Sequence, residues 1–355
     1  MRELTELPAA IGSVQMVDPA TDAGWDAKVQ ACSSSSFFHS AAWARVLQDT
    51  YGYAPAYFIL TSAGRLQALL PVMEVDSWLT GRRGVSLPFT DDCEPVCSDA
   101  GAFRRVYEAA VGYAQDRGWK YLECRGGRAH FADAPASTSF YGHRLNLAGT
   151  EDALFASFES ANRRAVRKAE KSGVSVEVTQ SLDAVRAFYG LLCETRKRHG
   201  VPPQPYRFFR NIHQHILSQD RGFVVLAKYR DRPVAGAVYF HWGKRGIYKY
   251  GASDETAQQL RANNLVMWEA IKWYGRNGFA ELHFGRTSLM NEGLRRFKLG
   301  WGTEEYSIEY VRYDWRAGGF VTAKDEAAGW HNRVFRALPL PLSRLIGSAL
   351  YKHVA

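Results

Sequence analysis

The chain has 355 residues, of which 46% are hydrophobic and 23% are charged. These proportions are ordinary for a globular protein that buries a sizeable core, and they exclude the disordered, collagen-like and low-complexity classes. The 45 Lys and Arg residues outnumber the 36 Asp and Glu residues, which gives a formal net charge of +9. A positive balance favours an anionic partner, such as a nucleic acid, a phosphate ester or a membrane surface, but it also fits a merely basic globular protein.

The first half of the sequence predicts a short α+β unit, because helical and alternating apolar spacings follow one another between turn-forming residues. Ser40 is the expected N-cap of its first helix. The elements expected here are a helix over 37–50, two strands within 53–75, a loop over 81–98, a helix over 101–117, a strand over 119–126, and a loop and strand over 131–149.

The second half predicts a longer version of the same plan. Its expected elements are one or two helices over 151–173, a strand over 174–180, helices over 182–200 and 206–219, three antiparallel strands within 222–253, a helix over 263–277, and strands over 280–285 and 303–314. A chain of this length favours two domains. We therefore expect an α+β protein with units at 1–149 and 150–315, each a mixed, mostly antiparallel sheet flanked by helices, and a helical tail at 316–355.

The cysteines and the apolar runs indicate where the chain resides. Five cysteines occur without a C-x-x-C pair, namely Cys32, Cys93, Cys97, Cys124 and Cys193. Their odd number and spacing predict reduced thiols in a cytosolic protein, and no metal site. No apolar stretch reaches the ~20 residues that a membrane span needs, and the N-terminal segment lacks the apolar run of a signal peptide. We expect a cytoplasmic chain.

A polar loop before the helix at 263–277 forms a candidate anion site. Arg261, Asn263 and Asn264 lie where that helix begins. Free backbone N–H groups and the helix dipole both attract an anion at such a position. The alternative is an ordinary capped helix with a solvated Arg.

The order of strand, Arg-containing loop, helix and strand over 247–286 resembles the core of the GNAT acyltransferase superfamily. The loop departs from the usual Q/R-x-x-G-x-G/A signature, because Gln259-Leu-Arg-Ala-Asn-Asn-Leu lacks the glycines. Further segments resemble the FemAB/FemX-like family, which includes the BioF2-like acetyltransferase domain and the peptidoglycan aminoacyltransferases. These segments are SLPFTDDCEPV at 86–96, NRRAVRKAEKSGVSVEV at 162–178, FYGLLCETRKRHGVPPQP at 188–205 and ELHFGRTSLMNEGLRRFKLGWGTEE at 281–305.

The resemblance covers about residues 37 to 310 and is greatest to the FemAB-related proteins of exosortase and exopolysaccharide systems. It implies tandem GNAT-like domains that transfer an acyl or aminoacyl group to an amine by direct attack. The implied acceptor is an anionic peptidoglycan or exopolysaccharide precursor, linked to a lipid or a nucleotide. The implied co-substrate is acyl-CoA or aminoacyl-tRNA, with no tightly bound cofactor, and Arg261, Asn263 and Asn264 are its expected contacts.

Two basic segments are candidates for binding the anionic substrate. Arg163, Arg164 and Arg167 belong to a helix with five cations and one acid between 163 and 171, so an anionic partner would relieve their repulsion. A solvated helix face is the alternative. Arg196 and His199 close another helix, where cations also complement the helix dipole.

Candidates for the chemistry come from three other segments. Asp91 and Asp92 lie in a loop, where one carboxylate could orient or deprotonate the amine, or merely form a turn. Tyr248 and Tyr250 are two apart on a strand and are expected to share a face, as a proton donor or as core residues. Lys298 and Arg286 follow the strand at 280–285, and we expect both to contact an anion or a carbonyl oxygen.

The tail combines apolar and basic residues. These are Leu342, Leu345, Ile346 and Leu350 together with Arg333, Arg336, Arg344 and Lys352. Such a segment can lie on an anionic inner-membrane surface or dock on its own chain.

Two rival functions stand beside aminoacyl or acyl transfer to an envelope precursor. One is CoA-dependent N-acetylation of an amino sugar or small amine. The other is a non-catalytic module that binds an anionic polymer, tRNA or a membrane.

Overall fold

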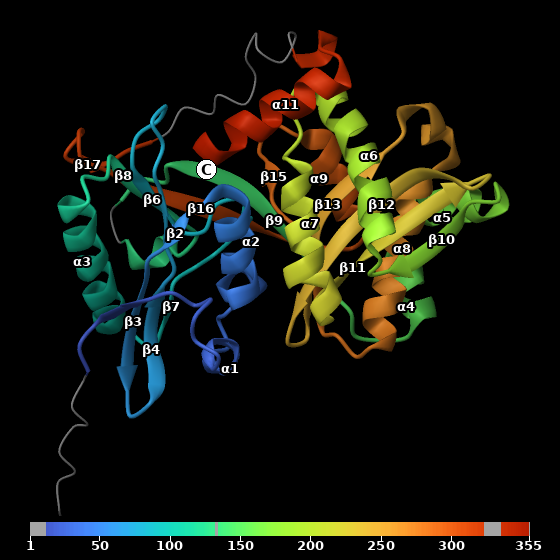
Figure 1. Ribbon diagram of the computed structural model, residues 1–355. Helices are drawn as coiled ribbons and strands as arrows, with labels where there is room; N and C mark the ends of the chain where they lie inside the picture. The colour runs from blue at the N-terminus through green and yellow to red at the C-terminus, as the bar shows by residue number, and fades with distance from the viewer. Residues whose placement is uncertain (1–11, 132–133, 323–334, 355) are drawn as a thin grey trace, which may run out of the picture.

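The computed structural model describes residues 12–131, 134–322 and 335–354, which form two sheets covered by helices (Figure 1). The smaller sheet has the strand order β1-β3-β4-β7. Its strands are β1 (Gln15–Val17), β3 (Tyr57–Ser62), β4 (Arg65–Leu70) and β7 (Val96–Cys97). Helix α3 (Ala100–Asp116) packs its apolar face on this sheet and closes a small core.

The larger sheet extends through both halves of the chain in the order β10-β11-β12-β13-β14-β9-β16-β8-β6-β5-β2. Its strands are β2 (Ala54–Pro55), β5 (Met73–Val75), β6 (Arg83–Val85), β8 (Tyr121–Arg125), β9 (Thr138–Asn146), β10 (Ser175–Thr179), β11 (Gly222–Tyr229), β12 (Arg232–Trp242), β13 (Arg245–Ser253), β14 (Glu281–His283) and β16 (Glu304–Asp314). Two short strands flank this path, β15 (Thr287–Ser288) on β9 and β17 (Gly319–Phe320) on β16. Among the described strands, only the β13–β14 and β6–β8 pairs are parallel.

Helices cover both faces of the second half of this sheet. Those not yet named are α1 (Trp25–Gln30), α2 (Ala41–Tyr51), α4 (Glu151–Ser157), α5 (Ser160–Lys171), α6 (Leu182–His199), α7 (Tyr206–His215), α8 (Ala262–Arg276), α9 (Glu292–Leu299) and α11 (Leu340–Leu350). Short 3-10 turns are η1 (Phe37–His39), η2 (Arg128–His130), η3 (Leu217–Gln219), η4 (Glu255–Leu260) and η5 (Tyr351–His353). One core lies between the sheet and α2, α6 and α7, and another lies on the opposite face beneath α5 and α8.

This architecture confirms the predicted α+β class with mostly antiparallel sheets flanked by helices. The first predicted helix is interrupted, because Ser40 accepts a hydrogen bond from the Trp43 amide and starts α2 there, after the separate turn η1. The 81–98 loop contains β6 and β7, which are too short for an alternating pattern to reveal. The domain boundary near 150 stays a prediction. Strand β9 precedes it, yet β9 pairs with β14 and β16 from beyond it.

The C-terminal segment packs on its own chain and contacts both halves. Helix α11 lies beside α6, where the Arg344 guanidinium donates to the Cys193 sulfur at 3.2 Å. A Cβ on Gly347 would lie 2.0 Å from the Pro203 carbonyl oxygen, so only glycine allows this close approach. Farther on, the His353 carbonyl accepts from Arg83 at 2.7 Å. Arg333, which belongs to the predicted basic tail, lies outside the described residues.

None of the helices in the described ranges is long and apolar enough to cross a bilayer.

Candidate functional site

A cavity lies where the neighbouring strands β13 and β14 diverge. They pair in parallel from Arg245 and Glu281 as far as Ile247 and His283, and then the pairing ends. The chain beyond β14 continues as β15, which pairs with β9. The opening between the two strands is a cavity of about 550 Å³, called here the main cavity, with walls from α6, β12, β13, α8 and α9.

The main cavity attracts anions. Among the described residues that line it, five are lysines or arginines and Asp91 is the single carboxylate. The five are Arg196, Arg198, Lys249, Arg286 and Lys298. Charges of one sign concentrated in a cleft raise the local concentration of an oppositely charged ligand.

Asp91 and Lys249 form a buried ion pair at the centre of this cluster. The Lys249 ammonium donates to the Asp91 carboxylate at 2.9 Å, and both side chains are nearly inaccessible. Burial alone would raise the pKa of Asp91, but the charges of Lys249 and Arg286 outweigh it, and the pKa lies below its usual range. The Asp91 carbonyl accepts from the Tyr310 hydroxyl at 2.8 Å. Asp91 is therefore a fixed carboxylate that already has a partner, and we assign it a positioning role.

Lys298 is the side chain in the cavity best suited to move a proton. Helix α9 buries it to 1% exposure, and its amine donates to the carbonyls of Gly285 at 2.8 Å and Arg286 at 3.1 Å. Burial lowers the pKa of Lys298 to about 7. At neutral pH much of the population is thus an uncharged amine whose two hydrogens are both bonded. Its lone pair is then free to accept a proton.

The two tyrosines of β13 lie on opposite faces of the sheet, so the prediction that they share a face is wrong. Tyr250 pairs with Val238 and Tyr248 pairs with Tyr239, which leaves Lys249 in a bulge opposite no residue of β12. A bulge adds one residue and reverses the alternation beyond it. Tyr250 consequently packs in the core beside α7, whereas Tyr248 packs in the core beside α8. Both rings still line the main cavity.

Close packing fixes Tyr248. A Cβ on Gly251 would lie 1.8 Å from the Tyr248 hydroxyl oxygen, so this glycine makes room for the ring. Burial raises the pKa of Tyr248 to about 12, and its hydroxyl therefore stays protonated near neutral pH.

The predicted anion contacts Arg196, His199 and Arg286 all line the main cavity. The Arg286 guanidinium lies 4.3 Å from the centre of the Phe140 ring and donates to the Tyr310 hydroxyl at 2.5 Å. Desolvation, together with the charges of Arg198 and Arg196, lowers the pKa of His199.

Arg198 also lines the cavity, although it was not among the predicted site residues. The run of cations in the last turn of α6 was the sequence signal for Arg198. Cations at that position also complement the helix dipole, and this structural explanation made a role in a binding site less apparent.

The basic helix α5 lies apart from this cluster. Arg163 donates to the Ala156 carbonyl, Arg164 donates to Ser160, and Arg167 lies over the Phe155 ring. None of these three residues lines the main cavity. Their contact with a substrate stays a prediction.

A smaller cavity of about 280 Å³, called here the α8 cavity, lies at the start of α8. Arg261, Asn263 and Asn264 all line it, as their position before the helix led us to expect. Arg261 is an exposed N-cap with a left-handed backbone (φ +60°), and Asn264 donates to Asn162 of α5 at 3.2 Å. Asn263, Ser253 and Phe297 line the main cavity too, so the two cavities adjoin.

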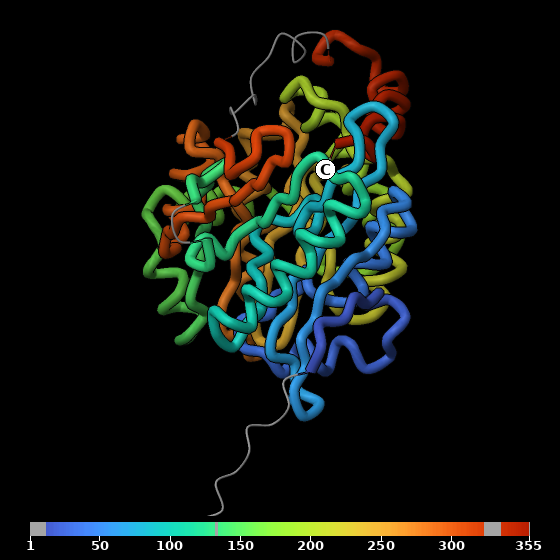
Figure 2. Tube along the Cα trace, turned by 90° about the vertical axis from the view of Figure 1, so that its left-hand side faces the viewer, coloured from blue at the N-terminus to red at the C-terminus, as the bar shows by residue number. Residues whose placement is uncertain are grey.

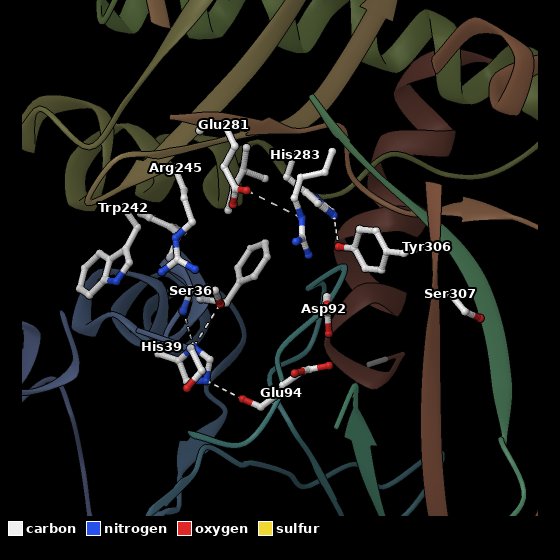
Figure 3. Close-up of a pocket in the computed structure, with 16 residues that line it drawn as sticks. Ser36, His39, Asp92, Glu94, Trp242, Arg245, Glu281, His283, Tyr306 and Ser307 are labelled. Carbon is white, nitrogen blue, oxygen red and sulfur yellow. Dashed lines mark hydrogen bonds and ion pairs between the residues drawn. The ribbon is translucent and has the colours of Figure 1, made fainter. Parts of the chain in front are cut away.

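Asp92 faces a different space from its neighbour Asp91. It lines a cavity of about 330 Å³ between the 34–39 segment, the 92–94 loop and the strands β13, β14, β9 and β16, called here the interface cavity (Figure 3). The backbone thus sends two consecutive carboxylates into separate cavities.

Known proteins resemble this chain in sequence and in fold. Residues 156–298, which hold every candidate residue except Asp91 and Asp92, match the family model of the acetyltransferase (GNAT) domain. Two proteins named lipid II:glycine glycyltransferase, from two strains of Staphylococcus epidermidis, are 22% identical over 221 residues, which cover 43% of this chain and 53% of the relative. The crystal structure of FemX superposes with a TM-score of 0.68 and 15% identity, covering 84% of this chain and 97% of that chain. The chain therefore matches the GNAT acetyltransferase domain over residues 156–298 and shares the fold of FemX.

This FemX-like chain spans about half the length, 53%, of the curated relatives it matches. Its fold also occurs in L-PGS from Bacillus licheniformis, with a TM-score of 0.54, 12% identity, and coverage of 95% of this chain and 98% of that chain. A tandem GNAT protein from the clavulanic acid biosynthesis pathway superposes with a TM-score of 0.52 and 12% identity over 85% of this chain and 98% of that chain. The predicted tandem GNAT-like fold is confirmed.

Proposed function

We propose that the chain is an enzyme that transfers an acyl or aminoacyl group to an amine of an anionic peptidoglycan precursor. The observation that carries this proposal is the buried Lys298, whose pKa is near 7, in a cationic cavity where two parallel strands part. The name of the Staphylococcus epidermidis relatives, lipid II:glycine glycyltransferase, supports a lipid-linked precursor as the acceptor. An exopolysaccharide precursor is a second acceptor class with the same anionic character.

The proposed reaction needs no covalent intermediate on the enzyme. The acceptor amine attacks the donor carbonyl, a C–N bond forms, and the bond from that carbon to the thioester sulfur or ester oxygen breaks. Neutral Lys298 takes the proton that the amine loses and then delivers it to the leaving group. We propose that Arg286, which lines the main cavity, and a backbone N–H at the Lys249 bulge stabilise the oxyanion.

The donor is acyl-CoA or aminoacyl-tRNA, and we propose that its phosphate groups occupy the α8 cavity. The start of α8 supplies backbone N–H groups and the positive end of a helix dipole, and exposed Arg261 adds a charge. Because the α8 cavity adjoins the main cavity, a phosphate held at α8 places the reactive carbonyl towards Lys298.

Equilibrium binding distinguishes the two donors. We expect either labelled acetyl-CoA or aminoacyl-tRNA to bind, and Arg261→Ala to weaken that binding by roughly fivefold, or about 1 kcal/mol. Arg210→Ala, an exposed arginine on α7, is the matched control and should bind the donor normally. If neither donor binds, both donor assignments fail. Steep salt dependence of polymer binding without turnover would instead favour a non-catalytic module.

We further propose that this cytoplasmic chain docks on the inner-membrane surface through a composite patch. The patch consists of Trp78, Leu79, Leu342, Leu345 and Val354, and Trp78 is 84% exposed. The Trp78 ring contacts His353, which joins the 76–82 loop to the C-terminal segment, and Figures 1 and 2 show this loop and α11 side by side. Residues 335–354 contain three cations and no acid. Exposed apolar side chains among cations fit an anionic bilayer surface.

Vesicle binding tests this patch. We expect the chain to sediment with vesicles that contain phosphatidylglycerol, and the double variant Trp78→Ser/Leu345→Ser to bind at least about fivefold more weakly. Met16→Ser, which alters an exposed apolar residue of β1, should bind like the unaltered chain. Equal binding of the double variant would remove the patch from the proposal.

A further inference from the structure

The interface cavity is separate from the main cavity and has a more acidic lining, with three carboxylates (Asp92, Glu94 and Glu281) and two arginines. The ring of Phe38 lines it, and the same ring lies 5.1 Å from the Lys249 ammonium of the main cavity. Phe38 and the Asp91-Asp92 backbone therefore form the wall between the two spaces. Figure 3 shows Asp92 and Glu94 together on one side of the interface cavity, opposite Glu281 and Arg245.

Asp92 is the unusual group in this cavity. Its Oδ1 atom is buried and has no hydrogen-bond partner within the described part of the chain. A Cβ on Gly126 would lie 2.2 Å from this oxygen, so a glycine with φ +104° makes room for the carboxylate. A buried carboxylate without a partner is costly unless a ligand supplies one. Burial, with the charges of Glu94 and Asp91, raises the pKa of Asp92 to about 7.

The cations of the interface cavity are already engaged. Arg144 lies over the Tyr306 ring at 4.6 Å and 3.9 Å from the Glu281 carboxylate. Arg245 donates to the Ser35 carbonyl. Among the described residues that line the cavity, the charged side chains without a hydrogen-bond or ion-pair partner are thus two carboxylates, Asp92 and Glu94.

The remaining walls suit a small organic cation. They are largely aromatic and come from Phe37, Phe38, Trp242 and Tyr306. Guanidinium groups already lie over two of these rings, Arg144 over Tyr306 and Arg221 over Trp242, so the rings serve as apolar walls around a ligand. Two unpaired carboxylates beside aromatic rings select a positive ligand, and 330 Å³ limits it to a small group or to one branch of a larger molecule.

We propose that the interface cavity binds a primary ammonium group, with Asp92 as its counter-ion and Phe38 and Trp242 as apolar walls. The ammonium belongs either to a free small amine or to an amine-bearing branch of a larger substrate. Both sources present the same chemistry to Asp92. The inference does not depend on the proposed transferase activity, because binding at equilibrium tests it.

Alanine amide is the probe, because it carries an ammonium group and no carboxylate. Calorimetry should detect binding of alanine amide with a Kd of about a millimolar or tighter, and no binding of N-acetylalanine amide, which lacks the charge. Asp92→Asn should weaken binding at least about tenfold. Glu177→Gln, an exposed carboxylate on β10, is the matched control and should leave binding unchanged. Binding of both probes alike, or unchanged binding in Asp92→Asn, would overturn the proposal.

A pH series on the unaltered chain keeps the test open if Asp92→Asn does not fold. The titratable and charged groups around Asp92 are Asp91 next to it in the chain and His39, Glu94, Arg144, Arg245, Glu281, His283 and Tyr306 in the cavity. Burial lowers the pKa of His39 and His283 to about 4, so neither changes charge between pH 6 and 8. The ionised fraction of Asp92 rises about tenfold between pH 6 and 8, while about half of the alanine amide loses its proton by pH 8, so alanine amide should bind about fivefold more tightly at pH 8 than at pH 6. Affinity that is flat or falls with pH would overturn the assignment.

Competition then identifies the source of the amine. If alanine amide inhibits turnover and a higher concentration of the amine acceptor relieves the inhibition, the bound ammonium group belongs to the acceptor. If the acceptor does not relieve the inhibition, or if alanine amide binds without inhibiting turnover, the cavity binds a separate small amine.

Discussion

Replacing Lys298 by Met is expected to reduce turnover at least about 100-fold while the chain stays folded. Lys298 is the one side chain of the described main cavity whose amine is buried, bonded to two carbonyls and close to half neutral at pH 7. Methionine fills a similar volume but leaves the Gly285 and Arg286 carbonyls without their donor, so we expect a loss of about 1–3 kcal/mol in stability and a folded chain at the assay temperature. Initial rates with the donor that binds, together with a thermal melt, measure both effects.

The control is Lys228→Met, which alters an exposed lysine paired with Glu177 and should keep its rate within about twofold. Lost turnover in both variants, or full turnover in Lys298→Met, would contradict the assignment.

The same lysine predicts the pH dependence of the reaction. A base must be neutral to accept a proton, so kcat/KM should rise about tenfold per pH unit below 7 and level off above it. The Lys298→Met variant should lose this dependence along with most of its rate. A rate that falls as pH rises through 7 would mean that the charged amine acts, as a stabiliser of the oxyanion.

The second large effect is expected at Asp91. Asp91→Asn leaves the Lys249 ammonium buried without its counter-ion, and the loss of one partner of a buried pair costs about 3–5 kcal/mol. Urea unfolding should record this loss. The double variant Asp91→Asn/Lys249→Met removes both charges and should recover most of the stability.

The control for this cycle is Glu177→Gln, which breaks the exposed pair with Lys228 and should cost less than about 1 kcal/mol. The pH dependence follows from the sign of the shift. The folded pKa of Asp91 is lowered, so its contribution is complete above the ordinary pKa of about 4 and is lost as pH falls through the folded value. Asp91→Asn should lack this acid-dependent loss. If the double variant does not recover the lost stability, Asp91 stabilises the fold through contacts other than the one with Lys249.

The sequence located much of the site because its signals there are local. Gly200 ends α6 in a left-handed conformation, and this stop leaves the cations Arg196 and Arg198 at the edge of the main cavity. The N-cap and the first turn lie at a helix N-terminus in any fold, and Arg261 and Asn263 accordingly line the α8 cavity. Arg286 and Lys298 were predicted because they follow the strand at 280–285, and both line the main cavity.

Other predictions depended on contacts that no local pattern reports. The register shift at Lys249 moves Tyr248 and Tyr250 to opposite faces, because a bulge is set by the pairing with β12 and not by the residues of β13 alone. The basic face of α5 was conspicuous in sequence, yet its arginines contact their own helix and its neighbour α4. A run of cations in the sequence shows that a helix face is basic, but it does not show what that face contacts in the fold.

Length, composition and periodicity by themselves determined an α+β chain with two similar units, because burial and element propensity act over a few residues at a time. The +9 charge indicated an anionic partner but not where it would bind. Only the tertiary structure decided that five of the cations gather around Asp91 in one cavity, whereas Asp92 turns away from them into another. Burial and distance set the charge state of Lys298, Asp91 and Asp92. Those quantities arise from segments far apart in sequence that the fold brings together.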